Sequence, residues 1–148
     1  MRVSQKCQYA LRAVFELAKR PGAEPVSTTQ IAAAQAIPKG FLEVILVQLK
    51  NGGFVRSRRG MRGGYQLTPS AQTLTLGEII RFVDGPIAPI DCMTDASRSE
   101  CGLNGDCAFM PFWERVRDAV ADVYETTTFQ DLIDSEQAAS QRHLGSNI

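Results

Sequence analysis

Three of the four cysteines lie within one 16-residue stretch, at Cys92, Cys101 and Cys107. Thiolates bind soft metal ions and iron–sulfur clusters, so this group predicts a site that senses a chemical signal. The stretch has no Cys-x2-Cys hook and the one histidine, His143, lies near the C-terminus, which argues against a zinc finger. Three thiolates would leave one position of a four-ligand cluster for another group. The competing interpretations are thiols that respond directly to oxidation, and a surface loop whose cysteines have no function.

A second chemically informative group is a run of arginines on a glycine-rich segment. Residues 54–58 predict a short strand, 59–64 a turn and 65–67 the returning strand. Glycine lets a backbone approach phosphate or enter a minor groove, and arginine supplies positive charge. The pattern therefore favours a nucleic-acid-binding wing over an ordinary solvated hairpin. The arginines are Arg56, Arg58, Arg59 and Arg62.

Three helices are predicted before this hairpin. Apolar residues at helical spacing indicate an amphipathic helix over 4–19, with Cys7 expected as a small buried residue on the apolar stripe. Ser27 can cap a second helix over 28–36, and a third is expected over 39–50. Two helices joined by such a short turn are typical of a helix-turn-helix. The expected buried face of the third helix is Phe41, Leu42, Ile45, Leu46 and Leu49.

Thr75 can cap a fourth helix over 76–83, and the cysteines follow in a stretch with little periodicity. A long helix is then expected over 112–125. The other faces of this helix are charged, and the helix follows a small domain. Both features favour a dimer-forming helix over a helix in the core of the monomer. Its apolar face is Trp113, Val116, Val120 and Val123.

These elements predict a mainly α fold with a small β-wing: a winged helix-turn-helix domain followed by a long dimerisation helix. The DNA-binding domain is expected over 1–84 and the cysteine-containing sensor loop over 85–110. The dimerisation helix and a short C-terminal helix, capped by Thr128, would occupy 111–134. A disordered tail is expected over 135–148 because the segment is polar.

Charge is divided unevenly between the two halves of the 148-residue chain, although the net charge is zero. Residues 1–81 hold 12 Lys and Arg against four Asp and Glu, which gives +8. Residues 82–148 hold four against 12, which gives −8. This division predicts a polyanion-binding module joined to a separate assembly or sensing module. No secretory or membrane-spanning segment is recognised, so we expect a cytoplasmic protein with reduced thiols.

Several motifs resemble the Rrf-two family of bacterial winged helix-turn-helix regulators, which includes iron–sulfur biogenesis, nitric-oxide and iron-responsive repressors. The wing motif is the most specific of them. The similarity extends from residue 1 to about 134 and covers the cysteine loop. The motifs are Met1-Arg2 with Lys6, Tyr9 and Ala10, Phe41-Leu42-Glu43, 49–55, 59–65, 76–80, 83–86 and 127–132.

The resemblance implies a homodimer bound to a pseudo-palindromic double-stranded operator, with recognition helices in major grooves and wings in minor grooves. Lys39, Gly40 and Glu43 would reach base edges, with Glu43 accepting a hydrogen bond from cytosine N4. Arg59 would enter the minor groove. The residues expected at DNA are Arg2, Ser27, Thr28, Thr29, Lys39, Gly40, Glu43, Arg58, Arg59, Arg62, Gly63 and Gly64.

The cysteine loop differs from the family pattern in its ligands. Eight residues separate Cys92 from Cys101, which is a long gap, and Ala108 stands where some members have a histidine ligand. Gln8 occupies the position from which other members supply an acidic ligand. The fourth ligand thus stays open among Cys7, Gln8, Asp91, Asp106 and a small molecule.

The leading hypothesis is a dimeric repressor, not an enzyme, whose operator affinity depends on a 2Fe–2S or a 4Fe–4S cluster held by Cys92, Cys101 and Cys107. The alternative is a cluster-free regulator that responds to thiol oxidation or to a partner protein such as a cysteine-biosynthesis enzyme. Segments 85–90 and 115–120 favour this alternative because they resemble cysteine-metabolism repressors of the same family. No catalytic motif is recognised.

Overall fold

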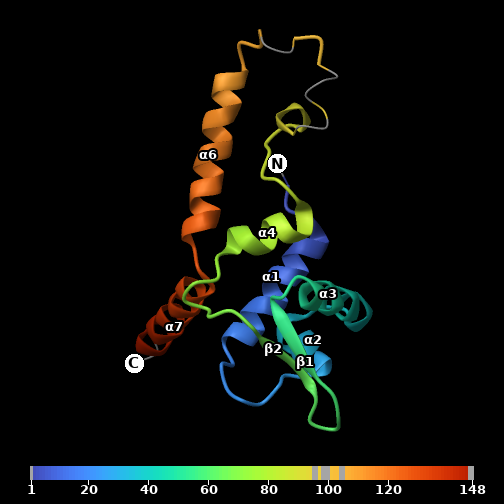
Figure 1. Ribbon diagram of the computed structural model, residues 1–148. Helices are drawn as coiled ribbons and strands as arrows, with labels where there is room; N and C mark the ends of the chain where they lie inside the picture. The colour runs from blue at the N-terminus through green and yellow to red at the C-terminus, as the bar shows by residue number, and fades with distance from the viewer. Residues whose placement is uncertain (1, 95–96, 98–100, 104–105, 147–148) are drawn as a thin grey trace.

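A computed structural model describes residues 2–94, 97, 101–103 and 106–146 (Figure 1). The chain is mainly helical and contains one two-stranded antiparallel sheet, as predicted. In chain order the elements are α1 (Gln5–Ala18), α2 (Thr28–Gln35), α3 (Lys39–Asn51), β1 (Val55–Arg58), β2 (Gly64–Leu67), α4 (Leu76–Asp84), the 3-10 helix η1 (Asp91–Met93), α6 (Met110–Thr126) and α7 (Phe129–Gly145).

Three helices begin with the same reciprocal cap. A serine or threonine oxygen accepts a hydrogen bond from the backbone N–H three residues later, and the side chain at that later position accepts one from the cap residue's N–H. These caps fix where the helices begin, and they confirm the caps expected at Ser27, Thr75 and Thr128. The pairs are Ser27 with Gln30, Thr75 with Glu78, and Thr128 with Asp131.

The turn between α2 and α3 bends the chain by 116°. Ala36 ends α2 in the left-handed conformation, with φ 49°. The bend lies within the range of helix-turn-helix motifs. In the described ranges no single helix is long and apolar enough to cross a membrane, and only the bent pair of α2 and α3 together meets that length and composition.

The wing is the hairpin of β1 and β2, with Val55 opposite Leu67 and Arg58 opposite Gly64. β2 is also attached to the segment before α2, because Tyr65 and Val26 exchange two backbone hydrogen bonds of 2.8 and 2.9 Å. The hairpin tip extends beyond the helices (Figure 1). The wing therefore has a firmly held base and an exposed tip.

The core forms around α1, which packs against α2, α3, α4 and α7. The predicted stripe of Ala10, Val14, Leu17 and Ala18 is buried. Phe129 at the start of α7 is fully buried in the same cluster. The core thus extends across the boundary expected at residue 84.

Two sequence predictions about this architecture were wrong. Phe41 was expected in the core but is 62% exposed, because it lies at the edge of the buried face of α3 and its ring instead approaches Tyr9 of α1, with centroids 6.3 Å apart. The tail from 135 was expected to be disordered, but α7 continues to Gly145, beyond the expected end near Ile133.

The extension of α7 is stabilised by side-chain contacts that a polar composition can provide. Gln130 donates to Asp134 over 2.8 Å, one helical turn away. Lys19, which directly follows α1, lies 3.3 Å from Glu136, and this ion pair ties the middle of α7 to α1. A helix that is polar on most faces is stable when such pairs support it.

The long helix expected after the cysteines is α6, which projects away from the helix-turn-helix (Figure 1). None of its side chains is buried within the single chain. Trp113, Val116 and Val120 are half-buried and Val123 is 58% exposed. An apolar stripe of this kind is left without a partner in one copy of the chain.

Candidate DNA-binding surface and cysteine loop

The residues expected at base edges lie on the outer side of α3. Lys39, Gly40 and Glu43 are exposed, while the opposite side of the helix is anchored by buried Leu42 and Leu46. The structure therefore places all three on one accessible helix near its N-terminus, the end from which recognition helices contact bases.

The residues expected at phosphates precede this helix. Thr29 is exposed and Thr28 is half-buried at the start of α2. The Ser27 hydroxyl accepts from the Gln30 N–H over 3.2 Å, so its demonstrated role is to cap the helix. Thr29 is the freest of the three to meet a phosphate.

The wing arginines are exposed at the hairpin. Among the described residues none of them forms a salt bridge, and only Arg56 makes a side-chain hydrogen bond, from Nε to Gln66 Oε1 over 3.3 Å. Uncompensated arginines at an exposed tip suit a polyanion, because binding releases the counterions that the phosphates hold. Arg58, Arg59 and Arg62 are therefore available to DNA.

The two wing glycines expected at DNA also have structural roles. A Cβ atom on Gly64 would lie 2.3 Å from the Val26 carbonyl oxygen, and its φ of 154° disfavours other residues. A Cβ atom on Gly63 would lie 2.4 Å from the Arg58 carbonyl oxygen. Both glycines are required by close backbone approaches, Gly63 within the wing and Gly64 between the wing and the segment before α2, whatever they do at DNA.

Arg2 is exposed but is not brought together with the wing. It lines a hollow of about 340 Å³ with Asp84, Pro86 and Tyr124, where the cysteine loop leaves α4. In Figure 1 the N-terminus lies on the side of the molecule away from the hairpin tip. The structure thus places Arg2 beside the start of the cysteine loop and not beside the wing.

Asp84 joins the start of α1 to the end of α4. Its carboxylate accepts hydrogen bonds from the Ser4 backbone N–H over 2.8 Å and from the Ser4 hydroxyl. The same hydroxyl accepts from the Cys7 N–H and caps α1. Sequence analysis did not identify this contact, because 80 residues separate its partners and no motif contains both.

Cys7 is fully buried at this junction, as expected. Burial and the nearby charge of Asp84 raise the pKa of its thiol to about 12. A thiol with that pKa stays protonated at neutral pH and is a poor metal ligand, since the thiolate is the species that binds. Cys7 is thereby disfavoured as the fourth ligand.

The other three cysteines are half-exposed and lie between α4 and α6, with Cys92 on η1. Within the ranges that the structure describes, no three His, Cys, Asp or Glu side chains lie close enough to hold a metal ion. Asp91, Asp106 and Gln8 are exposed. The chemistry of the donors fits thiolate ligation, but the described residues do not form a finished cage.

α6 packs against α4, and a charged pair lies at this contact. Arg81 pairs with Glu125, and a Cβ atom on Gly77 would lie 2.8 Å from the Glu125 carboxyl carbon. Glycine at position 77 therefore makes room for the charged pair. The cysteine loop therefore connects two helices, α4 and α6, that are also in direct contact with each other.

Buried Glu16 is a further residue that sequence analysis missed. It is 3% exposed, accepts from Gln35 over 2.7 Å and pairs with Arg20 at 2.8 Å and Lys19 at 3.5 Å. Burial alone would raise its pKa, but the Gln35 hydrogen bond and the two cations together lower it. The sequence feature that could have identified this site is the pair of basic residues, Lys19 and Arg20, three and four positions after Glu16.

Comparison with known proteins agrees with this geometry. The family model Rrf2, described as an iron-dependent transcriptional regulator, matches residues 3–135. The HTH-type transcriptional regulator CymR of Bacillus subtilis (strain 168) is 37% identical over 142 residues, which cover 94% of this chain and 96% of CymR.

Solved structures of two such regulators share the fold. The structure of CymR, the global cysteine regulator of B. subtilis, has a TM-score of 0.73 at 36% identity and covers 91% of this chain and 98% of its own. IscR of T. potens has a TM-score of 0.72 at 29% identity, with 94% and 90% covered. The helices and the two-stranded wing described above are common to these winged-helix proteins.

Proposed function

Because the chain belongs to the Rrf2 family of DNA-binding transcriptional regulators, we propose that it is a dimeric repressor whose operator affinity is set by an iron–sulfur cluster. Members of this family regulate transcription and are not enzymes. Cys92, Cys101 and Cys107 would hold the cluster. The observation that carries the proposal is their common location: three half-exposed thiols occupy the connection between α4 and α6, while the fourth thiol is buried elsewhere.

DNA binding would use the outer side of α3 and the wing. Lys39, Gly40 and Glu43 are accessible from one side of α3, and Glu43 would accept a hydrogen bond from a cytosine amino group. Arg59 at the wing would enter the adjacent minor groove. The net charge of +8 over residues 1–81 supports a polyanionic partner on this half.

A second copy of the chain would cover α6. This helix has 17 residues, and its apolar stripe is unburied in one copy. Packing two such stripes together would remove apolar surface from water and would set the distance between the two recognition helices. A Val120→Asp substitution should then dissociate the dimer in sedimentation experiments and weaken operator binding.

The signal would reach the DNA-binding half through the attachment of the loop. A bound cluster supplies iron whose oxidation state or presence changes with oxygen, nitric oxide or iron supply. The loop leaves α4 directly after Asp84, whose carboxylate is bonded to Ser4 at the start of α1. α1 in turn packs against α3. Ordering of the loop would therefore change the position of the recognition helix through these contacts.

A cluster-free regulator is the second candidate. It is favoured by the lack of any three-ligand group among the described residues and by the similarity to CymR, a global cysteine regulator. In that case the same thiols would respond to oxidation, or a partner protein would carry the signal.

The experiment that separates the two candidates is the iron and sulfide content and visible absorption of protein purified without oxygen. A brown protein with bound iron is expected, and Cys101→Ala should remove the colour while the protein stays folded. Cys7→Ala is the matched control, because it removes a buried thiol and should keep the iron. A colourless protein that resists reconstitution would refute the cluster and support the second candidate.

A further inference from the structure

The outer side of α3 carries two exposed valines beside the residues expected to read DNA. Val44 is 67% exposed and Val47 is 52% exposed. They are three positions apart, so they lie on the same side of the helix. The side of a helix that faces water is usually polar, and paired exposed valines indicate a surface that becomes covered.

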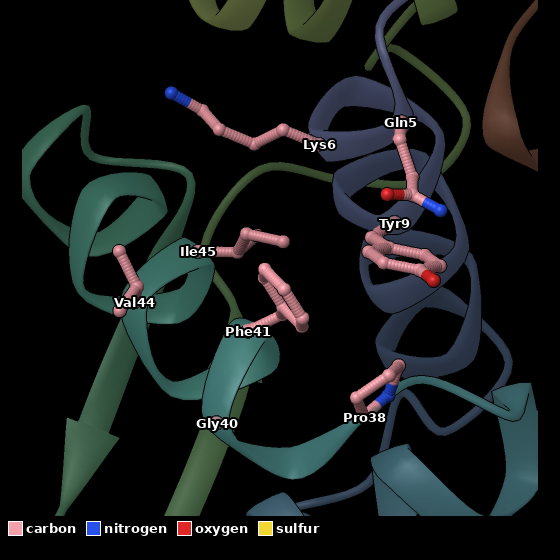
Figure 2. A pocket seen from close by; sticks show the side chains of 8 residues that line it. All are labelled: Gln5, Lys6, Tyr9, Pro38, Gly40, Phe41, Val44 and Ile45. Carbon is pink, nitrogen blue, oxygen red and sulfur yellow. The ribbon is translucent and has the colours of Figure 1, made fainter.

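Val44 is well presented for contact. Val44 lines the outer edge of a hollow of about 740 Å³ between α3 and α1, and in Figure 2 its side chain points away from α1, whereas Phe41 and Ile45 point toward α1. Gly40, one turn earlier on the same side, has no side chain, and no atom lies within 4 Å of the place of its Cβ atom. Because valine is branched at Cβ, its methyl groups are held in one preferred orientation on a helix.

The surroundings of Val44 identify what covers it. Glu43 precedes it in the chain, and exposed Lys39 and Lys50 lie on the same helix. The arginines of the wing follow directly after α3 in the chain. Residues 1–81, which include α3, carry a net charge of +8, and this charge complements a polyanion. DNA also presents apolar groups in its major groove, because thymine carries a methyl group there.

We propose that Val44 recognises a thymine in each operator half-site by packing against its C5 methyl group, next to the base read by Glu43. Thymine alone among the four bases presents a methyl group in the major groove. The inference rests on the proposed DNA-binding function and adds one specificity-determining residue to it. Val47, one turn farther along, would extend the same apolar contact.

The test removes one methyl group at a time from the DNA. The full chain first selects its preferred sequence from random duplex DNA, and each thymine of one half-site is then replaced by deoxyuridine, which lacks only the methyl group. At one thymine we expect about a fourfold loss of affinity, the factor that corresponds to burial of one methyl-sized group. Val44→Ala changes both protomers and so removes the contact in both half-sites, which should weaken binding to the normal site about sixteenfold. This variant should no longer distinguish thymine from deoxyuridine at that position.

Leu144→Ala is the matched control, since Leu144 is 73% exposed on α7, far along the chain from α3. This variant should discriminate against deoxyuridine as the unchanged protein does. If Val44→Ala keeps the full discrimination, or if no thymine is sensitive, the inference is refuted and the valine side of α3 meets something other than a thymine. If no DNA sequence is enriched at all, the failure lies with the proposed DNA binding itself.

Discussion

Replacing Gly64 with alanine tests whether the base of the wing is held by the close approach of two backbones. The added Cβ atom would lie 2.3 Å from the Val26 carbonyl oxygen and 2.8 Å from the Ser27 nitrogen. These are backbone atoms, so no side-chain rotation relieves the overlap. The two hydrogen bonds between Val26 and Tyr65 would therefore have to lengthen or break.

The magnitude follows from these contacts. Two backbone hydrogen bonds contribute about 2 kcal/mol together. The φ of 154° at Gly64 adds strain of about 1–3 kcal/mol for a residue with a side chain. We therefore expect Gly64→Ala to lower the free energy of unfolding by roughly 3–5 kcal/mol, measured by urea denaturation followed by circular dichroism.

Gly60→Ala separates strain from overlap. Gly60 has a φ of 112° at the wing turn, but no atom lies within 4 Å of the place of its Cβ atom. This control should lose only the strain energy of about 1–3 kcal/mol. If Gly64→Ala is no less stable than Gly60→Ala, the backbone approach is not the reason for glycine at position 64.

Three further results are expected. Arg59→Ala should weaken binding to all DNA sequences about equally and reduce the slope of log affinity against log salt by about two, because the dimer loses one phosphate neighbour at each wing. An unchanged slope would contradict contact with DNA. Because the pKa of Glu16 is lowered from its ordinary 4.5 in the folded protein, its contribution to stability is complete above that value and is lost as the pH falls through the folded pKa. Glu16→Gln should therefore flatten the loss of stability in urea titrations below about pH 5, and an equally steep loss would contradict this. At pH 8, iodoacetamide should leave Cys7 unmodified in metal-free folded protein, since burial raises the pKa of its thiol to about 12. Mass spectrometry should find alkylation at the other three cysteines. Rapid labelling of Cys7 would show that the contact between the start of α1 and the end of α4 opens.

The helices and the wing were predictable because local chemistry marks their limits. Ser27 and Thr75 cap helices through contacts three residues away, and the glycines of the wing mark a turn. The apolar stripe of α1 also follows directly from spacing. Where a few neighbouring residues decide the structure, the sequence alone was sufficient.

What could not be predicted depends on partners distant in the chain. Phe41 satisfies the apolar spacing of α3 but lies at the edge of its buried face, beside Tyr9. The length of α7 depends partly on Lys19, 117 residues before Glu136. The contact of Asp84 with Ser4 spans 80 residues. Periodicity reports which residues prefer burial, but it does not report which element will cover them.

For the candidate site, sequence predicted which residues are accessible better than it predicted how they are arranged. Lys39, Glu43 and Arg59 are exposed where DNA would meet them. The cysteines were recognised by type and spacing, but spacing in an irregular loop does not determine whether the thiols converge. Local signals specify the winged-helix scaffold, whereas no local signal in the sequence specifies how the cysteine loop is arranged.

The burial of Phe129 has a consequence for the order in which the protein is made. Its ring lies among core residues that come from α1 and the segment before α4, and its N–H donates to the Leu74 carbonyl oxygen over 3.1 Å. The ribosome completes the helix-turn-helix and the wing long before it reaches residue 129. Until then the nascent chain has a gap in its core, and a chain that stops early in α6 would keep that gap permanently. A premature stop codon after the wing should therefore yield an unstable, aggregation-prone fragment instead of an unregulated DNA-binding domain.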